Sequence, residues 1–226
     1  MKQLMRLIRD TRFIPRVLLY IFGIFVISIG TVFIINSELG VTPVQAVPMV
    51  ISLITELSIG TCIILVFIIF AIIQILILRK EFKWVQLTQI IMAFLFGFMV
   101  DFSNLLVSRI HIPGYFGQLL MLSIGIILLS CGVPLHMKAK IVTMPPEALT
   151  AAIKTKVKRW EFYQLRIIQD SILVVIAILL SFVFFHDLYG IREGTVICAV
   201  MVGKCIQYTS RLITPVLQKL GFNEEG

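Results

Sequence analysis

Three ionisable side chains lie inside two long apolar runs near the end of this sequence, where charge is costly and usually serves binding or ion exchange. Arg166 precedes Asp170 by four residues, so a helix would place both on one face. Asp170 follows Glu161 by nine residues and Lys204 precedes Arg211 by seven, which places both at roughly 10 to 14 Å from the same membrane face. We therefore expect an Asp170–Lys204 ion pair that Arg166 shares. Two interpretations stay open: a neutralised structural cluster that locks two helices, or a site where a substrate or proton exchanges with one partner.

Two short apolar segments, 42–57 and 143–154, lie between the long runs, and each carries a threonine and a proline at its start. Proline suits the first helical position, where its missing N–H is harmless, and a preceding hydroxyl can cap the helix. If these helices dipped into a membrane, their N-termini would present N–H groups to an anionic substrate group, with Gln45 and Glu147 as candidate contacts. Pro48 argues against this for the first segment, because a second proline would break a helix begun at Pro43.

The alternative is that both segments lie flat at the membrane surface as amphipathic helices. Four basic residues at the end of the second segment fit this arrangement, because they would contact anionic lipid head groups on the cytoplasmic face. They are Lys154, Lys156, Lys158 and Arg159. Both placements stay open.

Further polar residues are candidate contacts near the opposite ends of the runs. Asp101 lies near the outer end of one run and, with Arg192 and Glu193 at the start of the last run, could line an outer vestibule that includes Thr195. For these loop charges, anchoring at the interface is the alternative. Gln89 is a candidate substrate contact inside a run, where uncharged polar residues commonly make interhelical hydrogen bonds instead.

Enzymatic and metal-binding functions find no support in the residue pattern. The three histidines, His111, His136 and His186, stand at the ends of different runs, and no H-E-x-x-H spacing occurs. The chain has no Gly-rich phosphate loop with its lysine, which excludes an ATP-driven motor within it. The four cysteines lie in apolar runs without the paired spacing of a metal site. We expect no enzymatic activity, no metal and no cofactor.

The composition shows what must position these residues. Of 226 residues, 59% are hydrophobic and 14% are charged, and the mean hydropathy is +1.02. A transmembrane helix needs about 20 apolar residues, and six apolar runs meet that length. They are 15–35, 59–78, 85–107, 116–137, 162–185 and 194–212, the first read as an uncleaved helix. The fold class is therefore an all-α membrane protein with six transmembrane helices in a single membrane domain, 1–226.

The basic residues give the expected direction of these helices. Lys and Arg accumulate in short cytoplasmic loops. With the N-terminus inside, 16 of the 20 fall on the cytoplasmic side, two fall outside and two fall within spans. Both termini are therefore predicted to be cytoplasmic. The net charge of +8 is explained by this distribution, so we expect no nucleic-acid partner.

An internal repeat relates the two halves of the chain. A shift of 102 residues superposes two glycines, a serine, a proline and an alanine in order: Gly23 on Gly125, Ser28 on Ser130, Gly30 on Gly132, Pro43 on Pro145 and Ala46 on Ala148. A shift of 106 superposes Gly97 on Gly203. Repeat 1 spans about 15–107 and repeat 2 about 116–213, each with three crossings and one extra short helix. An odd number of crossings makes the repeats inverted, which is typical of secondary transporters.

Several motifs resemble those of a known family. They are QLTQI at 86–90, FGFMVD at 96–101, PPEAL at 145–149 and YGIREGTV at 189–196, followed by Gly203. In these motifs the chain resembles the YczE/YyaS/YitT group of bacterial integral membrane proteins, nearest its YczE-like branch. The resemblance implies a six-helix fold and a multi-pass location in a bacterial plasma membrane. It implies no substrate.

The leading functional hypothesis is a small secondary transporter or permease of an unknown substrate, for which an anion is one option. A second hypothesis is a non-transporting accessory or regulatory protein of the membrane. A third is the membrane subunit of a multi-component transporter. The expected partners are the lipid bilayer, a small-molecule substrate, and either a second copy of the chain or a partner subunit.

Overall fold

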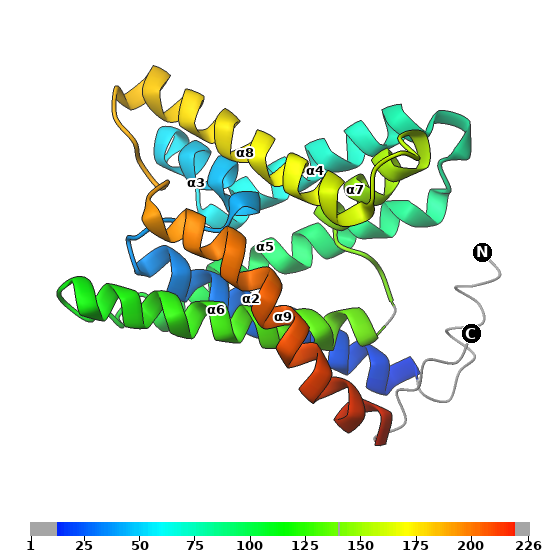
Figure 1. Cartoon of the computed structure of the whole chain (residues 1–226), viewed down its shortest axis with the longest axis horizontal. Coiled ribbons are helices and arrows are strands. Elements are labelled where there is room, and N and C mark those ends of the chain that lie inside the picture. Colours follow the sequence, from blue (N-terminus) through cyan, green and yellow to red (C-terminus); the bar gives the residue numbers. More distant parts are fainter. Residues whose placement is uncertain (1–12, 140, 220–226) are drawn as a thin grey trace.

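The computed structural model describes residues 13–139 and 141–219, and in that part the chain folds into eight α-helices (Figure 1). Six are long and apolar enough to cross a membrane: α2 (Phe13–Asn36), α4 (Ile59–Leu78), α5 (Thr88–Val107), α6 (Tyr115–Lys138), α8 (Phe162–Phe185) and α9 (Glu193–Lys219). Two are short: α3 (Pro43–Thr55) and α7 (Pro145–Lys156). Two 3-10 turns, η1 (Arg79–Glu81) and η2 (Trp84–Leu87), join α4 to α5. The predicted helical class, the six spans and the two short helices are confirmed, and the chain has the make-up of a multi-pass membrane protein.

Helices α2 and α6 share the most extensive helix–helix contact in the described part of the chain, and they run side by side in opposite directions in the lower part of the view (Figure 1). Two pairs of glycines let their backbones touch. A Cβ on Gly30 would lie 2.8 Å from the carbonyl oxygen of Gly125, and a Cβ on Gly132 would lie 2.8 Å from that of Gly23. Small residues at such positions allow the close packing on which helix association in membranes depends.

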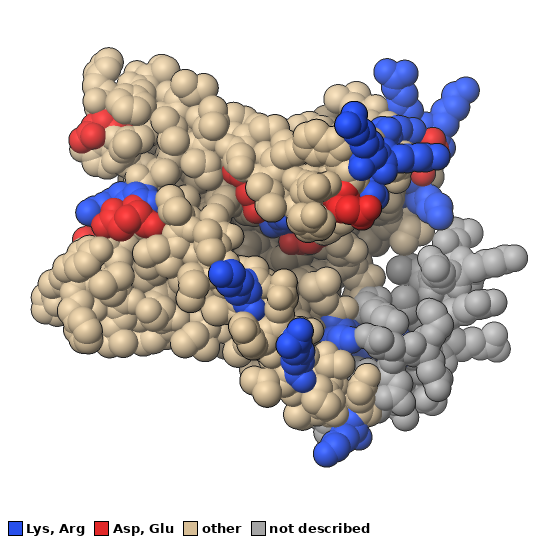
Figure 2. Space-filling view, viewed as in Figure 1, with Lys and Arg blue, Asp and Glu red and all other residues tan. Residues whose placement is uncertain are grey.

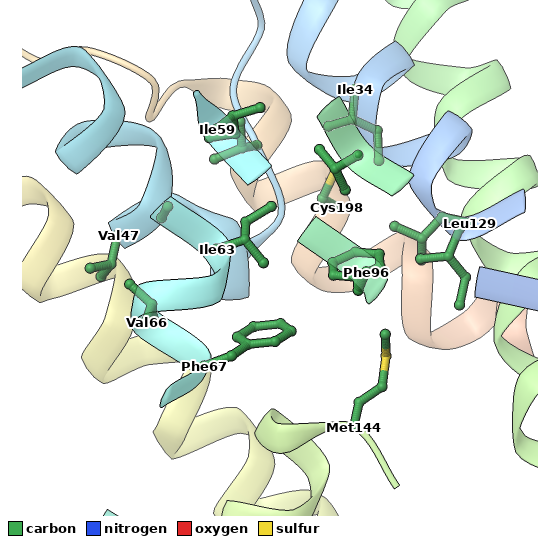
Figure 3. Close-up of a cluster of buried hydrophobic side chains, with 14 of the residues drawn as sticks. Ile34, Val47, Ile59, Ile63, Val66, Phe67, Phe96, Leu129, Met144 and Cys198 are labelled. Carbon is green, nitrogen blue, oxygen red and sulfur yellow. The ribbon is translucent and has the colours of Figure 1, made fainter. Parts of the chain in front are cut away.

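Helices α4 and α5 form a second close pair. A Cβ on Gly97 would lie 2.5 Å from the carbonyl oxygen of Gly60, so only glycine fits this crossing. Further along, the rings of Phe67 and Phe96 stack with their centres 5.9 Å apart. Figure 3 shows these rings facing each other, with Met144, the residue before α7, pointing toward them from the same buried cluster.

The two short helices pack inside the bundle, each against α4 and α8. Helix α3 continues through Pro48 to Thr55, so the expectation that this proline would break the helix is wrong. The physical reason is local: a proline removes one backbone donor, and the buried face of α3, which includes Ala46 and Val50, holds the helix in place by packing.

Helix α9 is the least enclosed long helix. It packs against α6, where the hydroxyl of Thr209 donates to the carbonyl oxygen of Ser130 at 2.6 Å. It diverges from α8 (Figure 1), and Gly203 has no neighbouring atom within 4 Å of a Cβ placed there. In Figure 2 this face is hollowed between α8 and α9, and acidic and basic atoms lie in the hollow. Basic side chains also gather over the α4–α5 and α7–α8 connections, which we call the basic end of the structure.

Candidate functional site

The central feature is an ionised cluster between α7 and α8, formed by Glu147, Arg166 and Asp170. Arg166 Nη1 lies 3.3 Å from Glu147 Oε1, and Arg166 Nε donates to Asp170 Oδ2 at 3.3 Å. The three side chains are between 24% and 32% exposed, so other protein atoms cover most of each. Asp170 stands eight residues beyond the start of α8, or about 12 Å along it from the basic end. The structure thus places an arginine between two carboxylates well inside a span.

A hydrogen-bond network holds the first turn of α7 against α8 beside this cluster. The side chain of Gln169 donates to the carbonyl oxygen of Pro146 at 3.1 Å and accepts from the hydroxyl of Thr150 at 2.8 Å. All three residues are buried. Sequence reasoning missed Gln169 and Thr150, although each stands within three residues of a candidate carboxylate. This network keeps Glu147 at the distance that Arg166 can reach.

The cluster has one more acidic group than basic groups. Its one guanidinium and two carboxylates carry a formal charge of −1. Two carboxylate oxygens, Glu147 Oε2 and Asp170 Oδ1, are buried and accept no hydrogen bond, although Asp170 Oδ1 lies within ion-pair distance of Arg166 Nε, at 3.3 Å. Buried polar atoms are nearly always paired, so these two acceptors have capacity for a proton, a cation or a hydrogen-bond donor.

Lys204 does not join this cluster, and the expected Asp170–Lys204 ion pair is absent from the described part of the chain. Its side chain is exposed on α9. The reason is tertiary: α9 packs on α6 and lies apart from α8, so equal depth on the two helices does not bring the side chains together. Arg166, which lies on the same helix as Asp170, is the partner instead.

Gln45, which the expected repeat would pair with Glu147, has a different environment. Its amide accepts from the hydroxyl of Thr42 at 2.7 Å and donates to the hydroxyl of Thr31 at 2.9 Å. All three side chains are buried. Gln45 therefore fastens the start of α3 to α2 through neutral, satisfied bonds.

Asp101 caps the start of α4 and does not meet the charges of the α9 start. It accepts from the backbone N–H of Gly60 at 2.8 Å and from the hydroxyl of Ser58 at 2.7 Å. The vestibule that we expected it to share with Arg192 and Glu193 is not formed by these contacts. A carboxylate at a helix N-terminus satisfies orphan N–H groups and complements the helix dipole.

The remaining residues of that expected vestibule brace the loop between α2 and α3. Arg192 lies 3.4 Å from Glu193 and donates to the carbonyl oxygen of Glu38 at 3.3 Å. The buried hydroxyl of Thr195 accepts from the backbone N–H of Val41 at 3.2 Å. These contacts fix one end of α9 to the α2–α3 loop.

Gln89 takes no part in the ionised cluster and pairs with another buried amide. Its amide donates to the amide oxygen of Gln74, and both side chains are buried. The pair lines a cavity of about 300 Å³ between α4, the start of α5 and α7. The other lining residues are Leu78, Val85, Gln86, Thr88, Ile141, Val142, Thr143, Ala148, Ala151, Ala152 and Thr155.

Two of the basic residues expected to meet lipid head groups pair within the protein. Lys156 lies 2.8 Å from Glu81 and Lys154 lies 3.6 Å from Glu161. These side chains are largely exposed, so the pairs add little stability. Within residues 13–139 and 141–219, no group of three potential metal ligands comes together.

The chain is 27% identical over 161 residues to an uncharacterized protein, YyaS, of Bacillus subtilis (strain 168), which covers 71% of this chain and 78% of the relative. YyaS is one of the three names in the group that the motifs resemble; the YczE-like branch stays an expectation. No solved structure matches the chain. Residues 14–211 match the profile of a family of unknown function (DUF6198), and the chain belongs to that family.

Proposed function

We propose that this protein is a small secondary transporter built from two inverted repeats, and that the Glu147–Arg166–Asp170 cluster is its coupling site. The observation that carries the proposal is this cluster itself. Arg166 and Asp170 lie in the span α8, and Glu147 on α7 contacts Arg166 there. Ionisable groups inside a span are costly to maintain, and they mark ion or substrate pathways in membrane proteins. Two carboxylate oxygens that accept no hydrogen bond, and a formal charge of −1, favour exchange of a proton at this place, rather than capture of the anion that helix N-termini alone would suit.

The glycine contacts between α2 and α6 support the inverted repeat. Gly23 and Gly30 correspond to Gly125 and Gly132 by the shift of 102 residues. In the structure, Gly30 packs on Gly125, and Gly132 packs on Gly23. A twofold axis in the membrane plane would produce such reciprocal contacts between equivalent residues. The short helices behave alike: α3 packs on α8 of the other half, and α7 packs on α4.

The contacts of the short helices favour re-entrant helices over surface helices. Gln45 at the start of α3 bonds Thr31, which stands five residues, or about 8 Å, from the end of α2. Glu147 at the start of α7 meets Arg166 inside α8. Each N-terminus therefore lies below the ends of the long helices, where broken helices of transporters commonly form their sites.

The two repeats differ in the packing of their last two helices, and this difference supports alternating access. Gly97 on α5 touches Gly60 on α4, whereas a Cβ on its repeat equivalent Gly203 on α9 would have no atom within 4 Å. In the alternative state of the proposed transporter, α9 closes on α8 as α5 does on α4. That movement would bring Lys204 toward Asp170, so their ion pair belongs to the closed state in this proposal.

The test uses the purified full chain in liposomes that contain a pH-sensitive dye. A panel of amino acids, amides, polyols, carboxylates and amines is added outside, and proton movement is followed. We expect at least one solute to drive proton movement in the wild type, and none to do so in Glu147→Gln or Asp170→Asn.

The matched control is Glu81→Gln, which removes an exposed carboxylate from the α4–α5 connection and should keep wild-type coupling. Unchanged coupling in both cluster variants, or no solute-driven proton movement in the wild type, would contradict the proposal. A stoichiometric partner that copurifies with the chain would instead favour an accessory protein or a transporter subunit.

A further inference from the structure

The cavity between α4, α5 and α7 differs in chemistry from the ionised cluster. None of its lining residues is ionisable. Six carry amide or hydroxyl groups: Gln74, Gln86, Thr88, Gln89, Thr143 and Thr155. The others are aliphatic, with three alanines of α7 along one wall. Its volume of about 300 Å³ is at the small end of the range for ligand sites.

We propose that this cavity is the substrate site of the transporter and that it takes a small, uncharged, planar solute of the amide or lactam type. An ion would lose its hydration in the cavity without meeting an opposite charge, which is strongly unfavourable. An amide solute would meet complementary hydrogen-bonding groups in the cavity. The bond between Gln89 and Gln74 leaves an acceptor oxygen on Gln89 and a donor nitrogen on Gln74, and a planar amide offers one donor and one acceptor that complement them.

Helix α7 is a shared wall between the cavity and the ionised cluster. Ala148, Ala151, Ala152 and Thr155 follow a helical spacing of three and four residues, so one face of α7 lines the cavity. Pro146 and Thr150 bond to α8 on another face, next to Glu147. A change in the charge of Glu147 that shifts α7 would therefore change the cavity. In this respect the inference rests on the proposed function, because the cluster then couples transport to proton movement and the cavity binds the transported solute.

The test measures binding without transport. The purified full chain in nanodiscs is examined by ligand-observed NMR with three matched pairs of probes: nicotinamide and nicotinate, benzamide and benzoate, uracil and orotate. Each pair compares an uncharged ring compound with its carboxylate counterpart. We expect the uncharged members to bind and the carboxylates not to bind.

Two substitutions place the binding in the cavity. Ala151→Phe fills its exposed rim and should abolish binding, and Gln89→Met removes the amide and should weaken it about tenfold. The control is Ala199→Phe, the same change at an exposed alanine of α9, which should leave binding as in the wild type. A second readout needs no bulky substitution: the thiol of Ala151→Cys should react with maleimide, and bound uracil should slow that reaction. The wild type, with its four native cysteines, gives the background labelling.

Equal or tighter binding of the carboxylates, binding of no uncharged probe, or full binding by Ala151→Phe would each overturn this inference. The outcome is separate from that of the proton-movement assay. Binding with no proton movement would contradict the transporter and keep the site, whereas proton movement driven by a charged solute alone would keep the transporter and contradict this substrate class.

Discussion

The same substitution, glycine to alanine, should lower the stability of the protein at Gly97 and raise it at Gly203. A Cβ on Gly97 would lie 2.5 Å from both the carbonyl oxygen of Gly60 and Cγ1 of Ile64, which is 0.9 Å inside the 3.4 Å where ordinary contact begins. A backbone oxygen cannot turn away, so α4 and α5 must separate. Overpacking of this kind costs about 3 kcal/mol at the upper end of its range, and the gain in helix propensity offsets about 1 kcal/mol.

Gly97→Ala should therefore lower the free energy of unfolding by about 2 kcal/mol. Gly203→Ala meets no atom within 4 Å and keeps only the propensity gain, so it should raise that free energy by up to about 1 kcal/mol. The two variants should differ by about 3 kcal/mol.

The assay is SDS-induced unfolding of the purified protein in mixed micelles, followed by the fluorescence of its two tryptophans, Trp84 and Trp160. Equal stability of the two variants would refute the reasoning. It would mean either that α4 and α5 do not touch at Gly60, or that α8 and α9 do touch at Gly203. A destabilised Gly203→Ala would point to the second case.

Three further predictions use the same unfolding assay. Arg166→Met leaves two carboxylates without a counter-charge and should lower the free energy of unfolding by about 2 kcal/mol. This is less than for a fully buried pair, because the side chains are about a quarter exposed. The double variant with Asp170→Asn should recover at least half of the lost stability, and no recovery would contradict the charge argument. Asp101→Ala removes the cap of α4 and should cost about 1 to 2 kcal/mol, whereas Asp101→Asn, which keeps an acceptor, should cost less; equal losses would argue against capping. Thr195→Val leaves the backbone N–H of Val41 unpaired in a buried place and should cost about 1 to 3 kcal/mol; a neutral result would mean that another acceptor replaces the hydroxyl.

The spans were predictable because a membrane helix requires a long, mostly apolar stretch, and such stretches are visible in the sequence. The predicted runs 59–78 and 162–185 coincide with α4 (Ile59–Leu78) and α8 (Phe162–Phe185). The last helix was predicted to end at residue 212, and α9 continues to Lys219. Its final turns carry polar residues among apolar ones, so the apolar run ends before the helix does.

Contacts between helices were predictable only where sequence spacing determines them. Arg166 and Asp170 are four residues apart on one helix, and their contact follows from helical geometry alone. The expected partner Lys204 is on another helix, where sequence gives the depth of a residue but neither the direction of its side chain nor the neighbour of its helix. Asp101 was misplaced for the same reason, since its partners Ser58 and Gly60 come from a loop and a helix start.

The two short helices begin alike, but only α7 carries the candidate site. Gln45 and Glu147 each stand two residues after a proline, and each binds a side chain of a long helix. Gln45 is neutral, and its bonds to Thr31 and Thr42 occupy both ends of its amide. Glu147 is ionisable, and one of its oxygens has no hydrogen-bond partner. The start of α3 is therefore a neutral joint to α2, whereas the start of α7 meets α8 through a group whose charge can change, and a Glu147→Gln substitution would place an amide at both positions.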